Sequence, residues 1–562
     1  MPIKTLPSIL LEDYNAGFED REGSPTASNG ILVPSLPGLN RMVDMWKILL
    51  DIIDFVYLLT LVGMAVYGLN NLVSVILYLE TRDRPNPSSR RKPPAVWPRV
   101  TVQLPAYNER YTIERLINAV ARFDYPRDRL QVQVLDDSTD DTTNLIRRLV
   151  TKYADAGLDI KLLHRRNQAG YKAGALAEGL KTATGELIAI FDADFVPPAN
   201  WLKKTVPGFR DRHLGCLQTR WGHLNDKFNT LTLAQSLGID GHFVIEQTAR
   251  SRNHLFMNFN GSAGLWRKAC IEDAGGWQSD TLTEDLDLSY RAQMRGWRID
   301  YLPEVVVPAE LPAQIEAFKK QQFRWAKGSF QTLKKLVPSL LKSDAPWYKK
   351  ILGLIHMTGY IVHPLMLLSL LLMLPVGLFS PQVFKLTPWL IFAVIAPPVM
   401  YLLSATEHLP RLGDRLRLIP ILTVLGFGLS LNNTVAAVQG LFNKGRGVFV
   451  RTPKFNLTNL KRDWKNSRYA VPVSPMVWAE LGLGFYALLA GIILPANLRW
   501  QTMPWLLVYS ASYFYIAGLN LVQAGHVDRL RTTVSASVKP MNRNLAEQIS
   551  TESSTFRQER LR

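Results

Sequence analysis

The sequence predicts an α/β domain with a parallel sheet, inserted between transmembrane helices. The first observation is an uncharged apolar run from Phe55 to Leu79. At about 1.5 Å per residue, this run is long enough to cross a hydrocarbon core of about 30 Å. The second is a series of apolar runs in the C-terminal third of the chain. The third is the intervening region 99–345, where short apolar runs alternate with helical patterns, as is typical of a parallel α/β sheet.

Five apolar runs are predicted to cross the membrane, at 55–79, 353–379, 387–405, 476–496 and 503–524. The run at 418–442 is expected to lie in the membrane interface. If it crossed, the Lys- and Arg-rich loop after it would face the side opposite the basic linker, against the positive-inside rule. It also carries Asn432 and Asn433, which are costly at bilayer depth unless paired. The N-terminal tail is then outside, and the C-terminus is cytosolic.

The net charge of +18 comes from 65 Lys and Arg residues against 47 Asp and Glu residues. A basic balance suits a nucleic acid, an acidic ligand or a membrane surface. Because the excess of positive charge is mostly explained by membrane-proximal loops, no nucleic-acid partner is expected. The two cysteines, Cys216 and Cys270, give neither a disulfide framework nor a metal-binding spacing. The N-terminus lacks the pattern of a cleavable signal peptide.

These patterns divide the chain into successive segments. They are a mobile N-terminal tail (1–45), a first transmembrane segment (46–80), a basic linker (81–98), the α/β domain (99–345), a transmembrane helix pair (346–410), an interface helix with a following loop (411–470), a second transmembrane pair (471–527) and a polar C-terminal tail (528–562).

Within the α/β domain, strands are predicted at 100–104, 132–135, 160–163 and 187–191. Ligands of parallel α/β sheets bind beyond the carboxyl ends of the strands. Three of these ends carry acidic side chains, so we expect Glu109, Asp136, Asp137, Asp192 and Asp194 to gather at one rim. Clustered carboxylates repel one another, and an Asp-x-Asp pair suits a divalent cation such as Mg²⁺. The alternative is a set of loop-capping aspartates without a ligand.

Two helix starts add candidate groups. GYKAGAL, residues 170–176, places Lys172 and small residues where free backbone N–H groups can bind a diphosphate. An ordinary Gly-flanked helix start would look the same. Glu284 and Asp285 follow Thr283 at a second helix start, and here a plain N-cap with acidic first-turn residues is the alternative.

The segment QQFRW places Gln321, Arg324 and Trp325 just before the chain returns to the membrane. These residues could anchor the interface and bind lipid headgroups. An indole with nearby amide and guanidinium donors also suits a sugar ring and a phosphate.

Taken together, six motifs resemble those of the family 2 processive glycosyltransferases, which include cellulose, chitin and hyaluronan synthases. In order along the chain they are DDSTD, GYKAGAL, DAD, FNGSAG, TED and QQFRW. The segments VQVLDDSTD, GYKAGAL, AGGW and QQFRW are most similar to those of cellulose synthase-like mannan and glucan synthases. The resemblance implies a GT-A-like (Rossmann-like) cytosolic catalytic domain between transmembrane α-helices, with Mg²⁺ or Mn²⁺ as cofactor.

The resemblance also implies roles on the donor side. Asp136 or Asp137 would contact the nucleoside, and Lys172 the diphosphate. Asp192 and Asp194 would hold the metal, with Asp192 also contacting the nucleotide.

On the acceptor side, Asp285 would be the general base, with Glu284 beside it in the catalytic motif. Gln321, Arg324 and Trp325 would form the acceptor and diphosphate subsite, and Gly261 and Ser262 would line the acceptor's path. The loop FVRTPK, residues 449–454, is similar to the family's gating loop, except that Arg451 replaces a valine.

We therefore expect an inverting, processive glycosyltransferase that uses UDP-glucose or GDP-mannose to extend a growing β-linked glucan or mannan and export it across the lipid bilayer. It would be a multi-pass protein of the plasma membrane, or of the Golgi membrane in a eukaryote. One alternative is transfer of a single sugar to a membrane lipid. Another is a transporter or receptor whose soluble domain only senses a nucleotide.

Overall fold

The computed structural model describes residues 37–84, 88, 91–406, 409, 411–443, 445, 447, 450–457, 464, 467 and 469–537. The chain divides into two units, Met1–Ile52 and Ile53–Arg562. The described part of the first unit is the beginning of helix α2 (Pro37–Thr81). All further description concerns the second unit.

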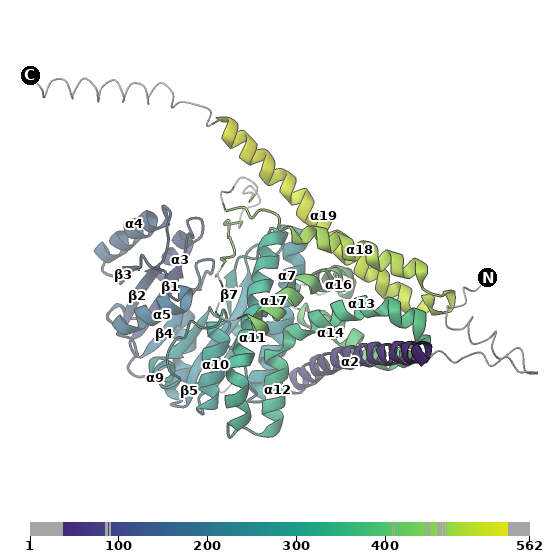
Figure 1. Ribbon diagram of the computed structural model, residues 1–562. Coiled ribbons are helices and arrows are strands. Elements are labelled where there is room, and N and C mark those ends of the chain that lie inside the picture. Colours follow the sequence, from purple (N-terminus) through teal and green to yellow (C-terminus); the bar gives the residue numbers. More distant parts are fainter. Residues whose placement is uncertain are drawn as a thin grey trace, which may run out of the picture. The chain divides into compact units, whose positions relative to one another are not determined.

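A seven-stranded sheet forms the centre of the α/β domain, in the order β3-β2-β1-β4-β6-β5-β7 (Figure 1). Its strands are β1 (Val100–Ala106), β2 (Leu130–Asp136), β3 (Asp159–His164), β4 (Leu187–Ile190), β5 (Leu214–His223), β6 (Gly264–Arg267) and β7 (Arg298–Ala309). The first four strands are parallel, as predicted, while β6 runs antiparallel to both β4 and β5. The expected α/β fold is confirmed in its mixed-sheet, GT-A-like form.

Strand β4 shows why these apolar runs form central strands. Because side chains alternate between the two faces of a sheet, Leu187 and Ala189 pack with the core that includes helices α3 and α4, while Ile188 and Ile190 pack with the core that includes α5. Both faces are therefore covered, and the strand reads as a continuous apolar run.

Helices fill the connections of the α/β domain. They are α3 (Ile113–Val120), η1 (Arg127–Arg129), α4 (Thr142–Asp155), α5 (Tyr171–Thr182), α6 (Trp201–Thr205), η2 (Val206–Arg210), α7 (Thr230–Asp240), η3 (Gly241–Gln247), α8 (Thr248–Arg252), α9 (Lys268–Asp273), α10 (Glu284–Met294), α11 (Ile315–Lys342) and α12 (Trp347–Met357).

The C-terminal part is helical. Its elements are η4 (Gly359–Ile361), α13 (Val362–Phe379), η5 (Pro381–Leu390), α14 (Ile391–Ser404), α15 (Leu412–Leu416), α16 (Ile419–Gly428), α17 (Ser430–Phe442), α18 (Met476–Ile493), η6 (Ala496–Leu498) and α19 (Arg499–Ser537). Helices α18 and α19 lie side by side (Figure 1).

Four helical segments among the described residues are long and apolar enough to cross a membrane: Asp44–Thr81, Gly359–Phe379, Met476–Ile493 and Ala496–Ala524. They overlap four of the five predicted spans. In the fifth, 387–405, Ile395–Ser404 is a short apolar helix. The run expected in the interface is bent by 42° between Leu412–Gly428 and Ser430–Phe442, a pair that can also be one broken span. These helices make the chain a membrane protein.

Candidate active site

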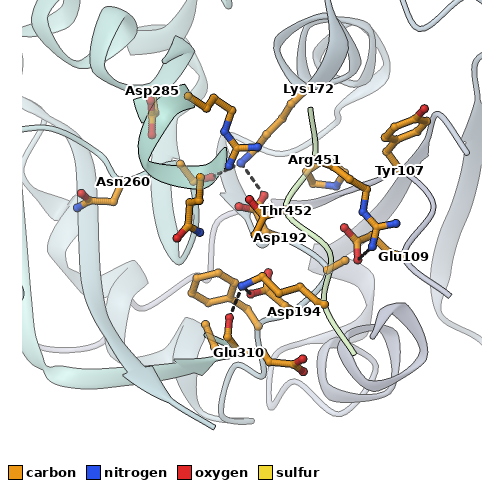
Figure 2. A pocket seen from close by; sticks show the side chains of 18 of the residues that line it. Tyr107, Glu109, Lys172, Asp192, Asp194, Asn260, Asp285, Glu310, Arg451 and Thr452 are labelled. Carbon is orange, nitrogen blue, oxygen red and sulfur yellow. Dashed lines mark hydrogen bonds and ion pairs between the residues drawn. The ribbon is translucent and has the colours of Figure 1, made fainter. Parts of the chain in front are cut away.

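One cavity opens at the carboxyl ends of β1, β2 and β4 (Figure 2). The sequence analysis assigned site roles to twelve residues, and ten of them line this cavity. Those that line the cavity are Asp137, Lys172, Asp192, Asp194, Gly261, Glu284, Asp285, Gln321, Arg324 and Trp325. Asp136 and Ser262 are not among the lining residues. Elements distant in sequence thus bring carboxylates and cations together around one space.

The two aspartates after β4 are each paired with a lysine. Asp192 Oδ1 lies 2.5 Å from Lys172 Nζ, and Asp194 Oδ2 lies 2.7 Å from Lys454 Nζ. The backbone N–H of Asp192 donates to Ser262 Oγ at 2.9 Å. Ser262 therefore supports the Asp-x-Asp turn from behind the cavity.

Lys172 is the second residue of α5 and lies in its first turn. Gly170 caps this helix with a φ of +75°, a left-handed conformation that glycine adopts without steric cost. Burial lowers the pKa of Lys172, but the carboxylates of Asp192, Glu284 and Asp285 more than offset this effect, so its pKa is raised. Lys172 is therefore a fixed cation at a helix N-terminus, where an anionic diphosphate is stabilised.

Asp285 lies in the first turn of α10, after Thr283, and its side chain borders the cavity. Its pKa is raised to about 7, mainly by burial and then by the carboxylate of Glu284, while Lys172 opposes the shift. A carboxylate with a pKa near neutrality is matched to general-base chemistry. In Figure 2, Asp285 lies on the side of the cavity opposite Glu109.

Gly261 fits between Asp285 and Lys172. Its carbonyl oxygen accepts a hydrogen bond from Lys172 Nζ at 2.8 Å, and its φ is +82°. A Cβ at this position would come within 2.9 Å of Asp285 Oδ2 and 3.4 Å of Lys172 Nζ. The close approach of backbone to both groups requires glycine here.

Gly261→Ala is therefore expected to lower both stability and turnover. The positive φ costs about 1–3 kcal/mol, and the added Cβ, 2.9 Å from Asp285 Oδ2, displaces the carboxylate. The loss of turnover should be up to about 100-fold, which is the effect of a misplacement of about 1 Å. Gly157→Ala is the matched control, because Gly157 has a φ of +83° and nothing within 4 Å of an added Cβ. Thermal unfolding and turnover should separate the two variants: the control loses stability alone. Equal turnover in both would show that the contacts of Gly261 are unimportant.

The two aspartates at the end of β2, Asp136 and Asp137, differ in surroundings. Asp137 borders the cavity and accepts two hydrogen bonds from Arg165. Arg165 Nε donates to Oδ1 at 2.8 Å, and Arg165 Nη2 donates to Oδ2 at 2.5 Å. Asp136 is fully buried and accepts hydrogen bonds from Ser138 N and Thr143 Oγ1 at 3.0 and 2.6 Å, and it pairs with His164. Only Asp137 is placed to meet a ligand in the cavity.

Helix α11 supplies Gln321, Arg324 and Trp325 to the cavity. Arg324 donates a hydrogen bond to the carbonyl of Val450 at 3.4 Å. Burial lowers the pKa of its guanidinium, although the carboxylates of Glu284 and Asp192 oppose this. Arg324 is thus a second cation facing the acidic side of the cavity.

The segment 450–457 makes contacts with the acidic rim that the sequence analysis did not predict. Lys454 pairs with Asp194, and Arg451 lies 3.3 Å from Glu109 Oε2. Glu310 Oε1 accepts hydrogen bonds from Phe455 N at 2.7 Å and Asn456 N at 3.0 Å. This segment includes most of the motif at 449–454, of which Phe449 lies outside the described residues. It borders the cavity through Arg451, Thr452 and Lys454.

The donor set fits a divalent cation of the Mg²⁺ type. In the described part of the chain, no group of three or more His, Cys, Asp or Glu side chains is arranged as a complete metal site. Mg²⁺ typically takes only one or two carboxylates and completes its octahedron with waters and substrate phosphates. Asp192 and Asp194 supply such a pair, beside a lysine placed for phosphates.

Comparisons with known proteins agree with this geometry. Residues 98–328 match the model of the family "Glycosyltransferase like family 2". The chain is 34% identical to glucomannan 4-beta-mannosyltransferase 9 of Arabidopsis thaliana over 410 residues, which is 71% of this chain and 76% of that protein. It is 36% identical to glucomannan 4-beta-mannosyltransferase 2 of the same plant over 359 residues, 62% of this chain and 66% of that protein. The chain thus spans about two thirds to three quarters of these relatives.

Among solved structures, the chain is similar to a mannosyltransferase from Pyrobaculum calidifontis in complex with GDP-Man and Mn²⁺. The identity is 24% and the TM-score 0.47, covering 70% of this chain and 99% of that one.

Proposed function

Because this chain belongs to the family 2 glycosyltransferases and is a glycosyltransferase, we propose that it transfers mannosyl residues from GDP-mannose to the end of a growing β-1,4-linked glycan. The observation that carries the proposal is the partly buried carboxylate of Asp285, with a pKa of about 7, in the same cavity as the Lys172–Asp192 pair. The names of the relatives, which are 4-beta-mannosyltransferases, support mannose over glucose.

In the proposed reaction, Lys172 and the N-terminus of α5 bind the diphosphate, and Asp137 approaches the nucleoside. A divalent cation held by Asp192 and Asp194 would neutralise charge on the departing diphosphate. Arg324 is placed to add a second positive charge, and Trp325 offers an apolar face to the sugar of the acceptor.

Asp285 acts on the acceptor. Its carboxylate takes the proton from the acceptor hydroxyl as that oxygen bonds to the anomeric carbon. The bond between this carbon and the diphosphate oxygen breaks in the same step, and the nucleoside diphosphate leaves. A single in-line displacement inverts the centre, so an α-linked donor gives a β-linked product.

Repeated transfer and export complete the proposal. A hydrophilic glycan cannot cross hydrocarbon unaided, and α11, which carries the acceptor residues, packs on α17, the second helix of the bent pair that can form one broken span. This arrangement supports the delivery of the product to the membrane helices as it grows.

A donor screen tests the function. Purified full-length protein is incubated with GDP-mannose or UDP-glucose and Mg²⁺ or Mn²⁺, and release of nucleoside diphosphate is measured. We expect release of GDP and an ethanol-insoluble product that an endo-β-1,4-mannanase degrades. A single-sugar product that partitions into chloroform would instead establish a lipid acceptor, and no release from either donor would contradict the proposal.

A further inference from the structure

Helix α11 contacts the cavity with one face and the C-terminal helices with the other. Gln321, Arg324 and Trp325 face the cavity. At 100° per residue, these three positions lie roughly 140–240° around the helix from Lys319. Lys319 therefore belongs to the opposite face, which packs on the C-terminal helices.

Lys319 is 1% exposed and its Nζ lies 2.6 Å from Oε1 of Glu480, which is fully buried on α18. Glu316 Oε2, one turn earlier on α11, is 3.7 Å from the same nitrogen. Burying such charges costs several kcal/mol per ion, and apolar residues of similar size often give equal or greater stability. An ionisable residue in a membrane helix is therefore a candidate for a functional role with its partner.

Other polar contacts fix the start of α11 at the same junction. The backbone N–H of Ile315 donates to Gln523 Oε1 of α19 at 2.9 Å, and Asn432 Nδ2 of α17 donates to the carbonyl of Lys319 at 3.1 Å. Gln314 exchanges two hydrogen bonds with the backbone of Val471, at 2.6 and 2.9 Å. Because hydrogen bonds and ion pairs are directional, they are satisfied together at only one rotation and height of the helix.

We propose that Glu480 is a positioning residue for acceptor binding. Through Lys319 it fixes α11 against α18. This contact determines the positions of the Gln321, Arg324 and Trp325 side chains in the cavity. The inference rests on the proposed function, since it assigns these three residues to the acceptor. It makes a residue within a membrane helix a determinant of turnover in the α/β domain.

The test uses the full-length protein with GDP-mannose as donor and β-1,4-mannohexaose as added acceptor. The first variant, Glu480→Gln, removes the nearer countercharge of Lys319 and leaves only the Glu316 carboxylate, 3.7 Å away. The second, Lys319→Met with Glu480→Met, is made in a Glu316→Gln background, so that no carboxylate stays buried without its cation. This double variant replaces the pair by apolar side chains and should fold, because such replacements are often neutral or stabilising. Tyr486→Phe is the control, since its hydroxyl bonds Leu371 O on α13 at 2.8 Å, away from α11.

In the double variant, we expect an unchanged thermal midpoint and GDP affinity, a raised KM for mannohexaose, and turnover lower by about 100-fold, the effect of misplacing reacting groups by about 1 Å. Glu480→Gln should show the same kinetic defect if it folds, and the control should match wild type. A folded double variant with wild-type turnover and acceptor KM overturns the inference and leaves the proposed function standing. Absence of transfer by the wild-type protein would instead remove the proposed function.

Discussion

Replacing Asp285 by asparagine is expected to lower turnover by about 10²- to 10⁴-fold, the usual contribution of a general base. Asparagine keeps the shape of the side chain but cannot accept the proton of the acceptor hydroxyl. Donor binding should survive, because Lys172 and Asp192, on other elements, remain in place. Loss of turnover with unchanged GDP affinity, measured by calorimetry, is the expected result.

The pH dependence gives this prediction a second readout. Asp285 must be deprotonated to act, and burial raises its pKa to about 7. Wild-type turnover should therefore fall as the pH decreases through about 7, and the residual turnover of Asp285→Asn should lack this step. Asp280→Asn is the matched control, because it removes an exposed carboxylate from the loop before α10. If Asp285→Asn kept wild-type turnover, Asp285 would not be the base.

Removing the divalent cation is expected to stop transfer. A metal that stabilises a leaving diphosphate is worth several kcal/mol, so chelation should lower turnover by about a thousand-fold or more. Asp192→Asn weakens the same site and also frees Lys172 from its ion pair. We expect this variant to need a higher Mg²⁺ or Mn²⁺ concentration for half-maximal turnover, measured by titration after chelation.

Restoration by added Mg²⁺ or Mn²⁺ controls for damage by the chelator. Full turnover of wild-type protein without any divalent cation would contradict the assignment of Asp192 and Asp194 to a metal.

The strands and the acidic rim were predictable from the sequence, because each depends on local patterns. LIAIFDADF, residues 187–195, shows a strand buried on both faces that ends in two aspartates, and the structure places both at the cavity. The start of α5 followed from a Gly-flanked lysine, and the resemblance to family 2 glycosyltransferases is confirmed by the relatives. Strands β5, β6 and β7 were not predicted. Strand β6, GLWR, is as short as β4, but it has only two apolar side chains, between a glycine and an arginine.

Long-range partners could not be predicted. The contacts of Lys454 with Asp194 and of Glu480 with Lys319 join segments that are far apart in the sequence, and no local periodicity indicates them. The burial of Asp136 could not be predicted for the same reason. Asp136 and Asp137 are adjacent aspartates, and only the contacts with Thr143 and His164 distinguish Asp136 from its neighbour.

The configuration of the product tests the central claim most directly. If one carboxylate, Asp285, activates the acceptor while an α-linked sugar nucleotide is held in the same cavity, the transfer is a single displacement. Carbon-13 NMR of the glycan made from labelled GDP-mannose should then show β-linked residues, from the one-bond carbon–proton coupling at the anomeric carbon. α-Linked residues would contradict the account, because they would require a second displacement for which Asp285 alone has no role.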